Sequence, residues 1–334
     1  MENSKINIGL IGAGHLGKMH IRNLLEISKE DPDVNFVGIY DINTEQAYEI
    51  SSELKVKSFG TLEEYFDNVD TTLIVTPTVT HFEIAKLAIE KGKNIFIEKP
   101  VTARVDEAKQ LKQMLESKKI VFQVGHIERF NPALLALRDI QIKPLFIECH
   151  RLAQFNPRGT DVSVVQDLMI HDIDLILSLV KSKVKNIEAS GVPIITHRID
   201  ISNARIKFEN GCVANITSSR ISQKRMRKMR IFQKSAYISI DFQDNESEIF
   251  NLVPKSDKRL KKSNSIVLPD SDMDILYEKL KGKEKNPMKI EQKHFIECIK
   301  NSTEPMITLD DGLQALEVAR EIILKSEEST KDFI

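Results

Sequence analysis

Short apolar runs that alternate with amphipathic stretches over residues 5–125 are the feature that most restricts the fold. The runs read INIGLIGAG, FVGIYD, TTLIVTP, NIFIEKP and IVFQVGH, and segments such as 81–91 and 105–117 between them have helical periodicity. Continuous runs of Val, Ile, Leu and Phe predict strands covered on both faces, and helical crossovers make such strands parallel. We therefore expect an α/β fold that begins with a doubly wound parallel sheet, a Rossmann domain, over residues 1–125.

Residues 126–334 have a different pattern and predict a second domain. Helical segments near 127–140 and 164–180 precede strand-like runs near 186–192, 201–209, 212–221, 229–233 and 237–242. The step Glu209-Asn210-Gly211 between two of these runs is typical of a hairpin turn. We expect a C-terminal α+β domain with a large, mostly antiparallel open sheet.

The end of the chain contains three amphipathic segments, near 273–281, 288–300 and 312–325, and the last helix is a candidate to pack back on the first domain. Residues 254–286 are rich in Lys, Asp and Ser, which predicts a solvated excursion with one short helix.

The charge balance excludes several classes of partner. The 334 residues include 48 Lys and Arg against 49 Asp and Glu, so no strong field attracts nucleic acid or an anionic membrane. The chain contains no apolar stretch of the roughly 20 residues that a spanning helix needs, and residues 1–6 do not resemble a targeting peptide. Its three cysteines have neither disulfide-scaffold nor zinc-site spacing, so we expect no metal and a reducing, cytoplasmic location.

The motif Gly12-Ala13-Gly14-His15-Leu16-Gly17 follows a predicted strand directly and begins a helical pattern. In a dinucleotide site the first glycine allows the tight turn, the second lets a pyrophosphate approach the backbone, and the third permits close packing of helix on strand. Outside this context the same motif is usually an ordinary turn. Here it predicts a dinucleotide cofactor.

Asp41 ends the second predicted strand, 24 residues after Gly17. A carboxylate at that position accepts hydrogen bonds from the ribose hydroxyls of the adenosine and repels a 2′-phosphate. The alternative is an aspartate in a surface turn. We predict NAD rather than NADP.

Two further pairs end predicted strands, Thr76-Pro77 and Glu98-Lys99. Ligands of open parallel sheets collect at the carboxyl ends of the strands, so these residues are candidates for cofactor contact, and Lys99 for substrate contact as well. His81 begins a helix beside the same crevice, where a packing or capping role competes with contact to NAD.

Asp167 and His171 lie four residues apart in an apolar helical segment, so both side chains share one face of the helix. Oxidation of an alcohol by hydride transfer needs a base for the hydroxyl proton, and an imidazole held by a carboxylate suits that task at neutral pH. The alternatives are a helix N-terminal acid beside a satisfied histidine and, with less support from spacing, a metal site.

Taken together, these motifs resemble the Gfo/Idh/MocA family of nicotinamide-dependent oxidoreductases. The resemblance is carried by GAGHLG, Asp41, the segment TPTVTHFEIAKLAIEKGKNIFIEKP, the Asp167-to-His171 segment and ITLDDGLQALEVAREI. It implies that Lys99 orients and polarises the reacting hydroxyl, that His171 is the acid or base, and that Asp167 assists it. It also implies a C-terminal open sheet that forms a subunit interface, in a homodimer or homotetramer.

Within the family, GHIERFNPALLAL, VSVVQDLMIHDIDL and SSRISQKRMRKMRIF resemble the UDP-N-acetylglucosamine 3-dehydrogenase type. That resemblance implies oxidation of the 3-hydroxyl of a UDP-linked acetamido sugar, with the ketone passed to an aminotransferase for lipid A precursors. Candidate contacts to the nucleotide sugar are Arg129, Asn131, Arg151 and Arg158, whereas the basic run at 224–230 fits a solvated strand face better. The alternatives are a dehydrogenase of a free sugar or inositol-type polyol and, in another class, a non-catalytic dinucleotide-binding sensor.

Overall fold

The computed structural model describes residues 5–157, 162–261, 264–283 and 285–330. Its internal contacts divide the chain into two compact units. The first consists of Met1–Ile127 with Asn286–Leu316, and the second of Glu128–Lys285 with Glu317–Ile334. The boundary falls two residues after the expected one, and the chain returns to the first unit near its end. Helix α9 (Leu309–Thr330) therefore begins in the first unit and ends in the second.

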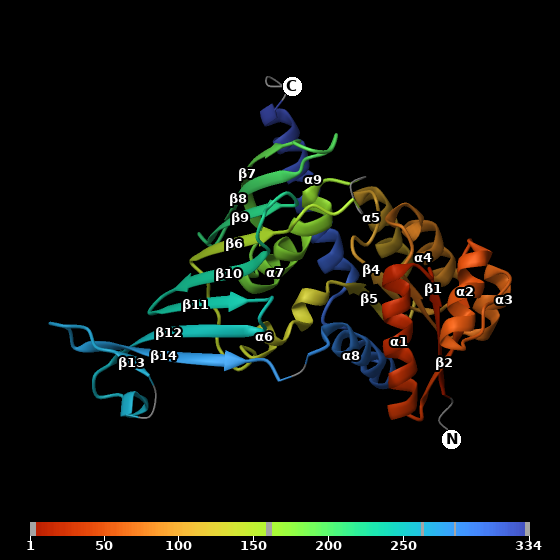
Figure 1. Cartoon of the computed structure of the whole chain (residues 1–334), viewed down its shortest axis with the longest axis horizontal. Coiled ribbons are helices and arrows are strands. Elements are labelled where there is room, and N and C mark those ends of the chain that lie inside the picture. Colours follow the sequence, from red (N-terminus) through yellow and green to blue (C-terminus); the bar gives the residue numbers. More distant parts are fainter. Residues whose placement is uncertain (1–4, 158–161, 262–263, 284, 331–334) are drawn as a thin grey trace. The chain divides into compact units, whose positions relative to one another are not determined.

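The first unit contains the predicted Rossmann sheet. Its five strands are parallel, in the order β2-β1-β3-β4-β5, and helices lie on both faces (Figure 1). The strands are β1 (Ile6–Ile11), β2 (Val34–Tyr40), β3 (Thr71–Ile74), β4 (Asn94–Glu98) and β5 (Phe122–Gly125). The helices are α1 (His15–Glu30), α2 (Thr44–Leu54), α3 (Leu62–Asn68), α4 (His81–Glu90), α5 (Val105–Leu115) and α8 (Pro287–Asn301), with a 3-10 turn η1 (Thr78–Thr80).

Apolar side chains from the sheet and two helices form the core of this unit. Ile8 and Leu10 of β1 and Phe96 of β4 are fully buried against α1 and α8, and Phe96 packs edge-on to Phe295 of α8 at 5.8 Å between ring centroids. Residues distant in sequence thus complete one face of the Rossmann sheet, which explains why α8 belongs to the first unit.

The second unit is built on a nine-stranded sheet in the order β13-β14-β12-β11-β10-β6-β9-β8-β7. All neighbouring strands are antiparallel except β6 and β9, which are parallel. The strands are β6 (Phe146–Leu152), β7 (Val184–Val192), β8 (Ile201–Phe208), β9 (Val213–Ser219), β10 (Met226–Gln233), β11 (Ala236–Asp241), β12 (Glu246–Pro254), β13 (Ser265–Ile266) and β14 (Met273–Lys281).

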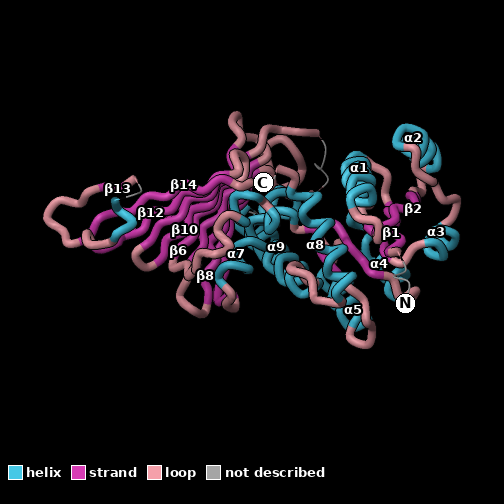
Figure 2. Tube along the Cα trace, turned by 90° about the horizontal axis from the view of Figure 1, so that it is seen from below, coloured by secondary structure: helices cyan, strands magenta, loops and turns pink. Residues whose placement is uncertain are grey.

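Helices of the second unit gather on one face of this sheet (Figure 2). They include α6 (Pro132–Leu135), the π-helical turn η3 (Val165–Met169) and α7 (Ile170–Val180), while 3-10 turns lie at η2 (Ile127–Phe130) and η4 (Lys258–Lys261). The predicted hairpin is confirmed: β8 and β9 pair antiparallel, and Gly211 has a φ of +88° at the turn. That backbone conformation favours glycine.

The structure corrects or specifies three sequence predictions about elements. The amphipathic segment predicted at 273–281 is strand β14, since nine residue pairs align it with β12. Asp274 and Leu276 are both buried on one face, which is the period of a strand. The expected helix near 127–140 is limited to the short turns η2 and α6. The short helix expected within 254–286 is η4, but the rest of that segment adds β13 and β14 to the sheet.

No helix in the described part of the chain is long and apolar enough to cross a membrane. The same residues contain no group of three or more His, Cys, Asp or Glu side chains arranged to hold a metal ion. Cys149, Cys212 and Cys298 all lie within the described ranges, where each is buried and in the free thiol form.

Candidate active site

The glycine motif forms the turn between β1 and α1, and its three glycines have three different surroundings. Gly12 has a φ of +100°, and a Cβ there would lie 2.5 Å from the Val75 carbonyl oxygen. A Cβ on Gly17 would lie 2.0 Å from the carbonyl oxygen of Gly12, so close packing of helix on strand requires glycine. Gly14, the N-cap of α1, has no atom within 4 Å of the position of a Cβ. That open space at a helix N-terminus fits a dinucleotide pyrophosphate.

Two further residues of the motif, His15 and Leu16, begin α1 with exposed side chains. Asp41 follows β2 directly and joins the two neighbouring turns. One carboxylate oxygen accepts a hydrogen bond from the Ala13 amide at 2.6 Å, and the other accepts from the Asn43 amide at 2.8 Å. The carboxylate thus lies beside the glycine turn, where ribose hydroxyls of a bound dinucleotide would reach it.

Thr76 and Pro77 follow β3, and Lys99 follows β4, so these residues lie at the same carboxyl edge of the sheet as the glycine turn. For His81 the sequence leaves contact to NAD and a packing role as alternatives, and the structure favours packing. Its ring is 1% exposed, and its Nδ1 and Nε2 atoms lie 2.9 Å and 3.0 Å from the carbonyl oxygens of Pro100 and Thr76. Burial lowers the pKa of His81. A neutral ring donates through only one of these nitrogens, so the buried ring packs between the two turns and hydrogen-bonds one of them.

Glu98 ends β4 with its carboxylate turned into the protein. Its Oε1 lies 2.8 Å from Nε2 of His20 on α1, and its Oε2 accepts a hydrogen bond from the Lys99 amide at 3.2 Å. Burial raises the pKa of Glu98, but the hydrogen bond from His20 and the charge of Lys99 lower it further, so the net shift is downward. Sequence reasoning missed His20; the available signal was a histidine in the apolar stripe of a helix three residues after the last motif glycine.

Asp167 lies in the π-helical turn η3, and His171 lies in the first turn of α7, so both come from one continuous helical segment of the second unit. Each is partly buried. The Asp167 amide donates to the Ser163 carbonyl oxygen at 3.1 Å, which sets the start of this segment. Single π turns inside α-helices occur frequently at functional sites.

Two of the arginines predicted to bind substrate are instead committed to buried ion pairs. Arg151 donates through Nε and Nη2 to Asp172 at 3.0 and 2.8 Å, and through Nη1 to Glu128 at 2.8 Å. Arg129 forms a similar two-pronged pair with Asp174, at 2.8 and 2.6 Å. All five side chains are less than 10% exposed. The fold brings acids of α7 to these arginines, a pairing that sequence spacing does not reveal.

Asn131 also has a structural role rather than the predicted substrate contact. Its amide nitrogen donates to the Phe242 carbonyl oxygen and to Glu128, each at 3.1 Å, and its amide oxygen caps α6. Arg158 lies outside the described residues. In β10, Met229 and Ile231 are buried while Lys228 and Arg230 are exposed, which confirms a solvated face for this part of the basic run.

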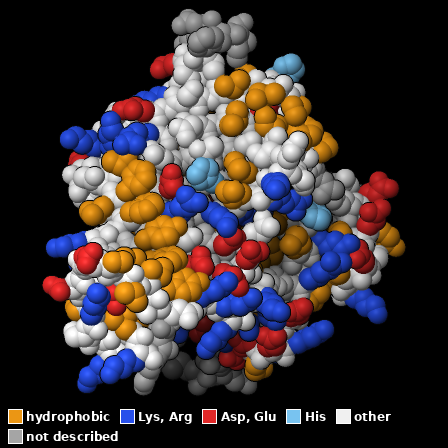
Figure 3. Space-filling view, turned by 60° about the vertical axis from the view of Figure 1, so that its left-hand side comes forward, with side chains coloured by type: hydrophobic (Ala, Val, Ile, Leu, Met, Phe, Trp, Pro, Cys, Tyr) orange, Lys and Arg blue, Asp and Glu red, His pale blue; other side chains and the backbone are white. Residues whose placement is uncertain are grey.

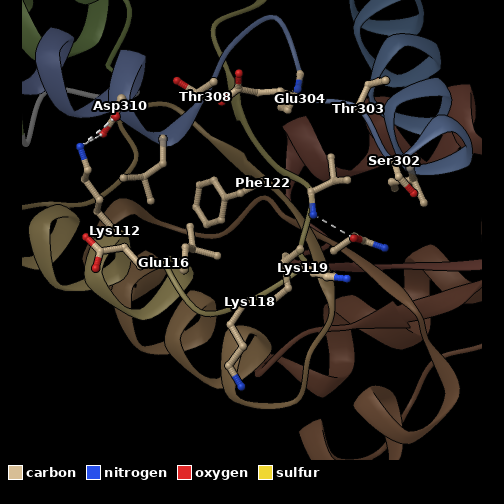
Figure 4. Close-up of a pocket in the computed structure, with 17 residues that line it drawn as sticks. Lys112, Glu116, Lys118, Lys119, Phe122, Ser302, Thr303, Glu304, Thr308 and Asp310 are labelled. Atoms are coloured by element: carbon tan, nitrogen blue, oxygen red, sulfur yellow. Dashed lines mark hydrogen bonds and ion pairs between the residues drawn. The ribbon is translucent and has the colours of Figure 1, made fainter.

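A cavity of about 700 Å³ in the first unit lies at the other edge of the Rossmann sheet (Figure 4). Asn94 and Phe122, which begin β4 and β5, line it together with an ion pair of 2.6 Å between Lys112 and Asp310. Ligands of parallel sheets bind at the carboxyl ends of the strands. This cavity is therefore separate from the edge that carries the glycine turn and Lys99.

Comparisons with known proteins agree with the fold and the motifs. Residues 6–126 match a family model described as the oxidoreductase family with an NAD-binding Rossmann fold, and residues 147–239 match the GFO/IDH/MocA C-terminal domain. The chain belongs to the Gfo/Idh/MocA oxidoreductase family. The cofactor of its N-terminal domain is NAD, as the glycine turn and Asp41 together predict.

Among relatives in this family, the UDP-N-acetylglucosamine 3-dehydrogenase of Acidithiobacillus ferrooxidans is 38% identical over 73% of this chain and 76% of its own length. A solved structure of that enzyme has a TM-score of 0.88 and 31% identity, and the match covers 98% and 99% of the two chains. The scyllo-inositol 2-dehydrogenase (NAD(+)) of Bacillus subtilis is 25% identical over 94% of this chain and 92% of its own. A levoglucosan dehydrogenase complex with NADH, 20% identical, has the same fold with a TM-score of 0.84 and coverage of 97% and 98%.

Proposed function

We propose that the chain oxidises the 3-hydroxyl of UDP-N-acetylglucosamine to a ketone, with NAD as the oxidant. The observation that carries the proposal is the similarity to the Acidithiobacillus enzyme, which extends over both units, at 31% identity and a TM-score of 0.88. The chain also has the lysine, aspartate and histidine that the reaction needs, Lys99, Asp167 and His171.

The roles follow from the chemistry of an alcohol oxidation. The Lys99 ammonium donates a hydrogen bond to the 3-hydroxyl oxygen and stabilises the charge that develops there. His171 accepts the hydroxyl proton, and Asp167 supports it in that role. Bound NAD supplies the acceptor for the hydride that leaves C3. The products are the 3-keto sugar nucleotide, NADH and a proton, so atoms and electrons balance.

The preference for NAD over NADP rests on Asp41. Its carboxylate, held by two backbone amides beside the glycine turn, offers acceptors to ribose hydroxyls and repels a phosphate on the 2′ oxygen.

The product indicates which kind of reaction follows this one. A ketone at C3 is a substrate for transamination, so the hand-off is to an aminotransferase, in the synthesis of lipid A or other surface polysaccharide precursors in the cytoplasm. Feeding the purified product to such an enzyme with an amino donor tests this step, since a 3-amino sugar nucleotide must appear.

We also place a homo-oligomer interface, in a dimer or tetramer, on the open face of the nine-stranded sheet. Five aromatic rings form a ladder across neighbouring strands, with ring centroids 5.0 to 5.8 Å apart; they are Phe146, Phe232, Tyr237, Phe250 and Tyr277. On the opposite face, their strand neighbours Ile147, Ile231, Ile238 and Ile249 are buried. Figure 3 shows a band of hydrophobic side chains on the surface that it faces. Such patches mark association surfaces.

Two alternatives remain open to test. The similarity to an inositol dehydrogenase over 94% of the chain favours a free polyol or sugar as the second candidate substrate. A non-catalytic dinucleotide sensor is the candidate from another class, and it has no chemical need for Lys99, Asp167 and His171.

One experiment separates these functions. Purified protein is incubated with NAD and, in parallel, UDP-N-acetylglucosamine, free N-acetylglucosamine or an inositol, while NADH is followed at 340 nm and the ketone is trapped by an added aminotransferase. The proposal requires NADH or trapped product with the UDP sugar alone, and loss of both in Lys99→Met with NADH binding retained. Turnover of the free polyol alone would show that the polyol, and not the UDP sugar, is the substrate. No turnover with any of the three compounds would support a non-catalytic dinucleotide sensor.

A further inference from the structure

Two buried histidines of the first unit contact the residues immediately before and after Lys99 in the sequence. His20, on α1, is fully buried and contacts Glu98, the residue before Lys99. His81, at the start of α4, contacts the carbonyl oxygen of Pro100, the residue after it. The backbone on both sides of Lys99 is therefore tied to the interior of the Rossmann unit.

The tautomer of His20 follows from its contacts with Gln292 on α8. The Gln292 amide nitrogen lies 2.7 Å from Nδ1 of His20 and 3.3 Å from the His20 carbonyl oxygen. In this orientation of the amide, its nitrogen donates to the His20 carbonyl oxygen, which only accepts, while the amide oxygen of Gln292 is buried without a hydrogen-bond partner among the described residues. The amide donates to Nδ1 as well, so Nδ1 has no proton, and the neutral ring carries its proton on Nε2.

The proton on Nε2 points at Glu98, 2.8 Å away. The other carboxylate oxygen of Glu98 accepts from the Lys99 amide, and a Cβ on Gly125 would lie only 3.1 Å from that oxygen. The carboxylate is thus enclosed, with one oxygen assigned to His20 and the other to the backbone of Lys99.

We propose that His20 is a positioning residue for Lys99. Gln292 holds the ring of His20 as the Nε2–H tautomer, and this ring fixes the Glu98 carboxylate. The carboxylate in turn fixes the backbone turn from which the Lys99 ammonium reaches the substrate. The inference rests on the role proposed above for Lys99. A reacting group displaced by about 1 Å loses about 100-fold in rate. The loss of His20 therefore acts on the chemical step through the direction of Lys99, without any contact between the imidazole and the substrate.

Two variants of His20 separate the hydrogen bond from simple packing. His20→Leu keeps an apolar side chain of similar size and removes the donor, whereas His20→Gln retains an N–H that reaches Glu98. We expect kcat with UDP-N-acetylglucosamine to fall about 30-fold to 100-fold in His20→Leu, with the NADH dissociation constant within threefold of wild type. His20→Gln should recover kcat to within about fivefold of wild type.

A matched control loses a buried hydrogen bond elsewhere in the same unit. The hydroxyls of Tyr65 and Thr72 lie 2.7 Å apart in the core, and Tyr65→Phe removes this bond without touching the Lys99 turn. Its kcat should stay within twofold of wild type. The proposal is overturned if His20→Leu keeps wild-type kcat, if His20→Gln is as slow as His20→Leu, or if Tyr65→Phe is equally slow.

A second measurement depends neither on turnover nor on whether His20→Leu folds. In protein labelled with 15N histidine, the ring of His20 is assigned by the signal that disappears in His20→Gln. We expect an unprotonated Nδ1 and a protonated Nε2, and a loss of this single tautomer in Gln292→Met. An Nδ1–H ring or an imidazolium in wild type overturns this inference alone. Wild-type turnover in Lys99→Met overturns the proposed role of Lys99 instead, so the two failures are distinguishable.

Discussion

Replacement of Arg151 by Met distinguishes a structural arginine from one that binds substrate. Its guanidinium joins Asp172 and Glu128, and all three side chains are less than 10% exposed. Removing one partner of a buried ion pair costs about 3 to 5 kcal/mol, since it leaves uncompensated charge in the interior. For a unit of this size each kcal/mol lowers Tm by about 2 to 4 °C, so we expect a fall of about 6 to 20 °C.

The pH dependence of this loss has a definite sign. Burial raises the pKa of Asp172, while Arg151 opposes the rise, so removal of the arginine moves the folded pKa further upward. A carboxyl whose folded pKa exceeds its unfolded pKa contributes stability at low pH that disappears as the pH rises through the folded value. The variant should therefore be closer to wild type in stability at pH 5.5 than at pH 8.

Thermal unfolding at the two pH values, together with the KM for the UDP sugar, measures both effects. Arg259→Met is the matched control, because Arg259 pairs with Asp257 at an exposed turn of the same unit and such pairs contribute at most about 1 kcal/mol. If Arg151→Met unfolds within 2 °C of wild type while KM rises more than tenfold, the assignment of Arg151 to the buried network is wrong.

Four further predictions follow from single contacts. Gly14→Ala should fold as wild type but lose NADH affinity. Gly17→Ala, whose Cβ would lie 2.0 Å from a carbonyl oxygen, should lose stability as well. Tight NADH binding by Gly14→Ala would contradict the placement of the pyrophosphate at Gly14. Asp41→Ser should raise the affinity for NADPH relative to NADH at least about tenfold in fluorescence titrations, and an unchanged ratio would refute the ribose contact. Burial raises the pKa of Asp200, but three backbone amides that donate to the carboxylate lower it further, so the net shift is downward. The stability that this carboxylate contributes is present above its unfolded pKa and is lost as the pH falls. In urea unfolding, Asp200→Asn should therefore be less stable than wild type by about 1 to 3 kcal/mol at pH 7 and by less at pH 4. Phe232→Glu should yield monomers in sedimentation that still bind NADH, and intact oligomers would exclude this face as the interface.

The carboxyl edge of the Rossmann sheet could be predicted from the sequence, because it depends on local patterns. A strand of apolar residues followed by a glycine turn and a helix places Gly12 to Gly17, and the same rule places Asp41 and Lys99 at the carboxyl ends of β2 and β4. Each of these positions follows from where a strand ends, without knowledge of distant contacts.

What sequence reasoning missed depends on residues far apart in the chain. The Arg151 guanidinium fits a phosphate as well as it fits Asp172 through Nε and Nη2, and only the packing of α7 beside β6 decides between the two partners. Gln292 determines the tautomer of a histidine 272 residues earlier. Residues 273–281 have apolar spacing compatible with helix or strand, and pairing with β12 decides in favour of the strand.

The central claim, that the chain removes a hydride from C3 of a UDP-linked acetamido sugar, has a direct isotopic test. UDP-N-acetylglucosamine with deuterium at C3 is incubated with NAD and the protein, and the reduced cofactor is analysed by mass spectrometry. The account predicts NADH one mass unit heavier, and no such label with deuterium at C2 or C4 of the sugar. Reduced cofactor without the label from C3, or with a label from another carbon, would contradict it.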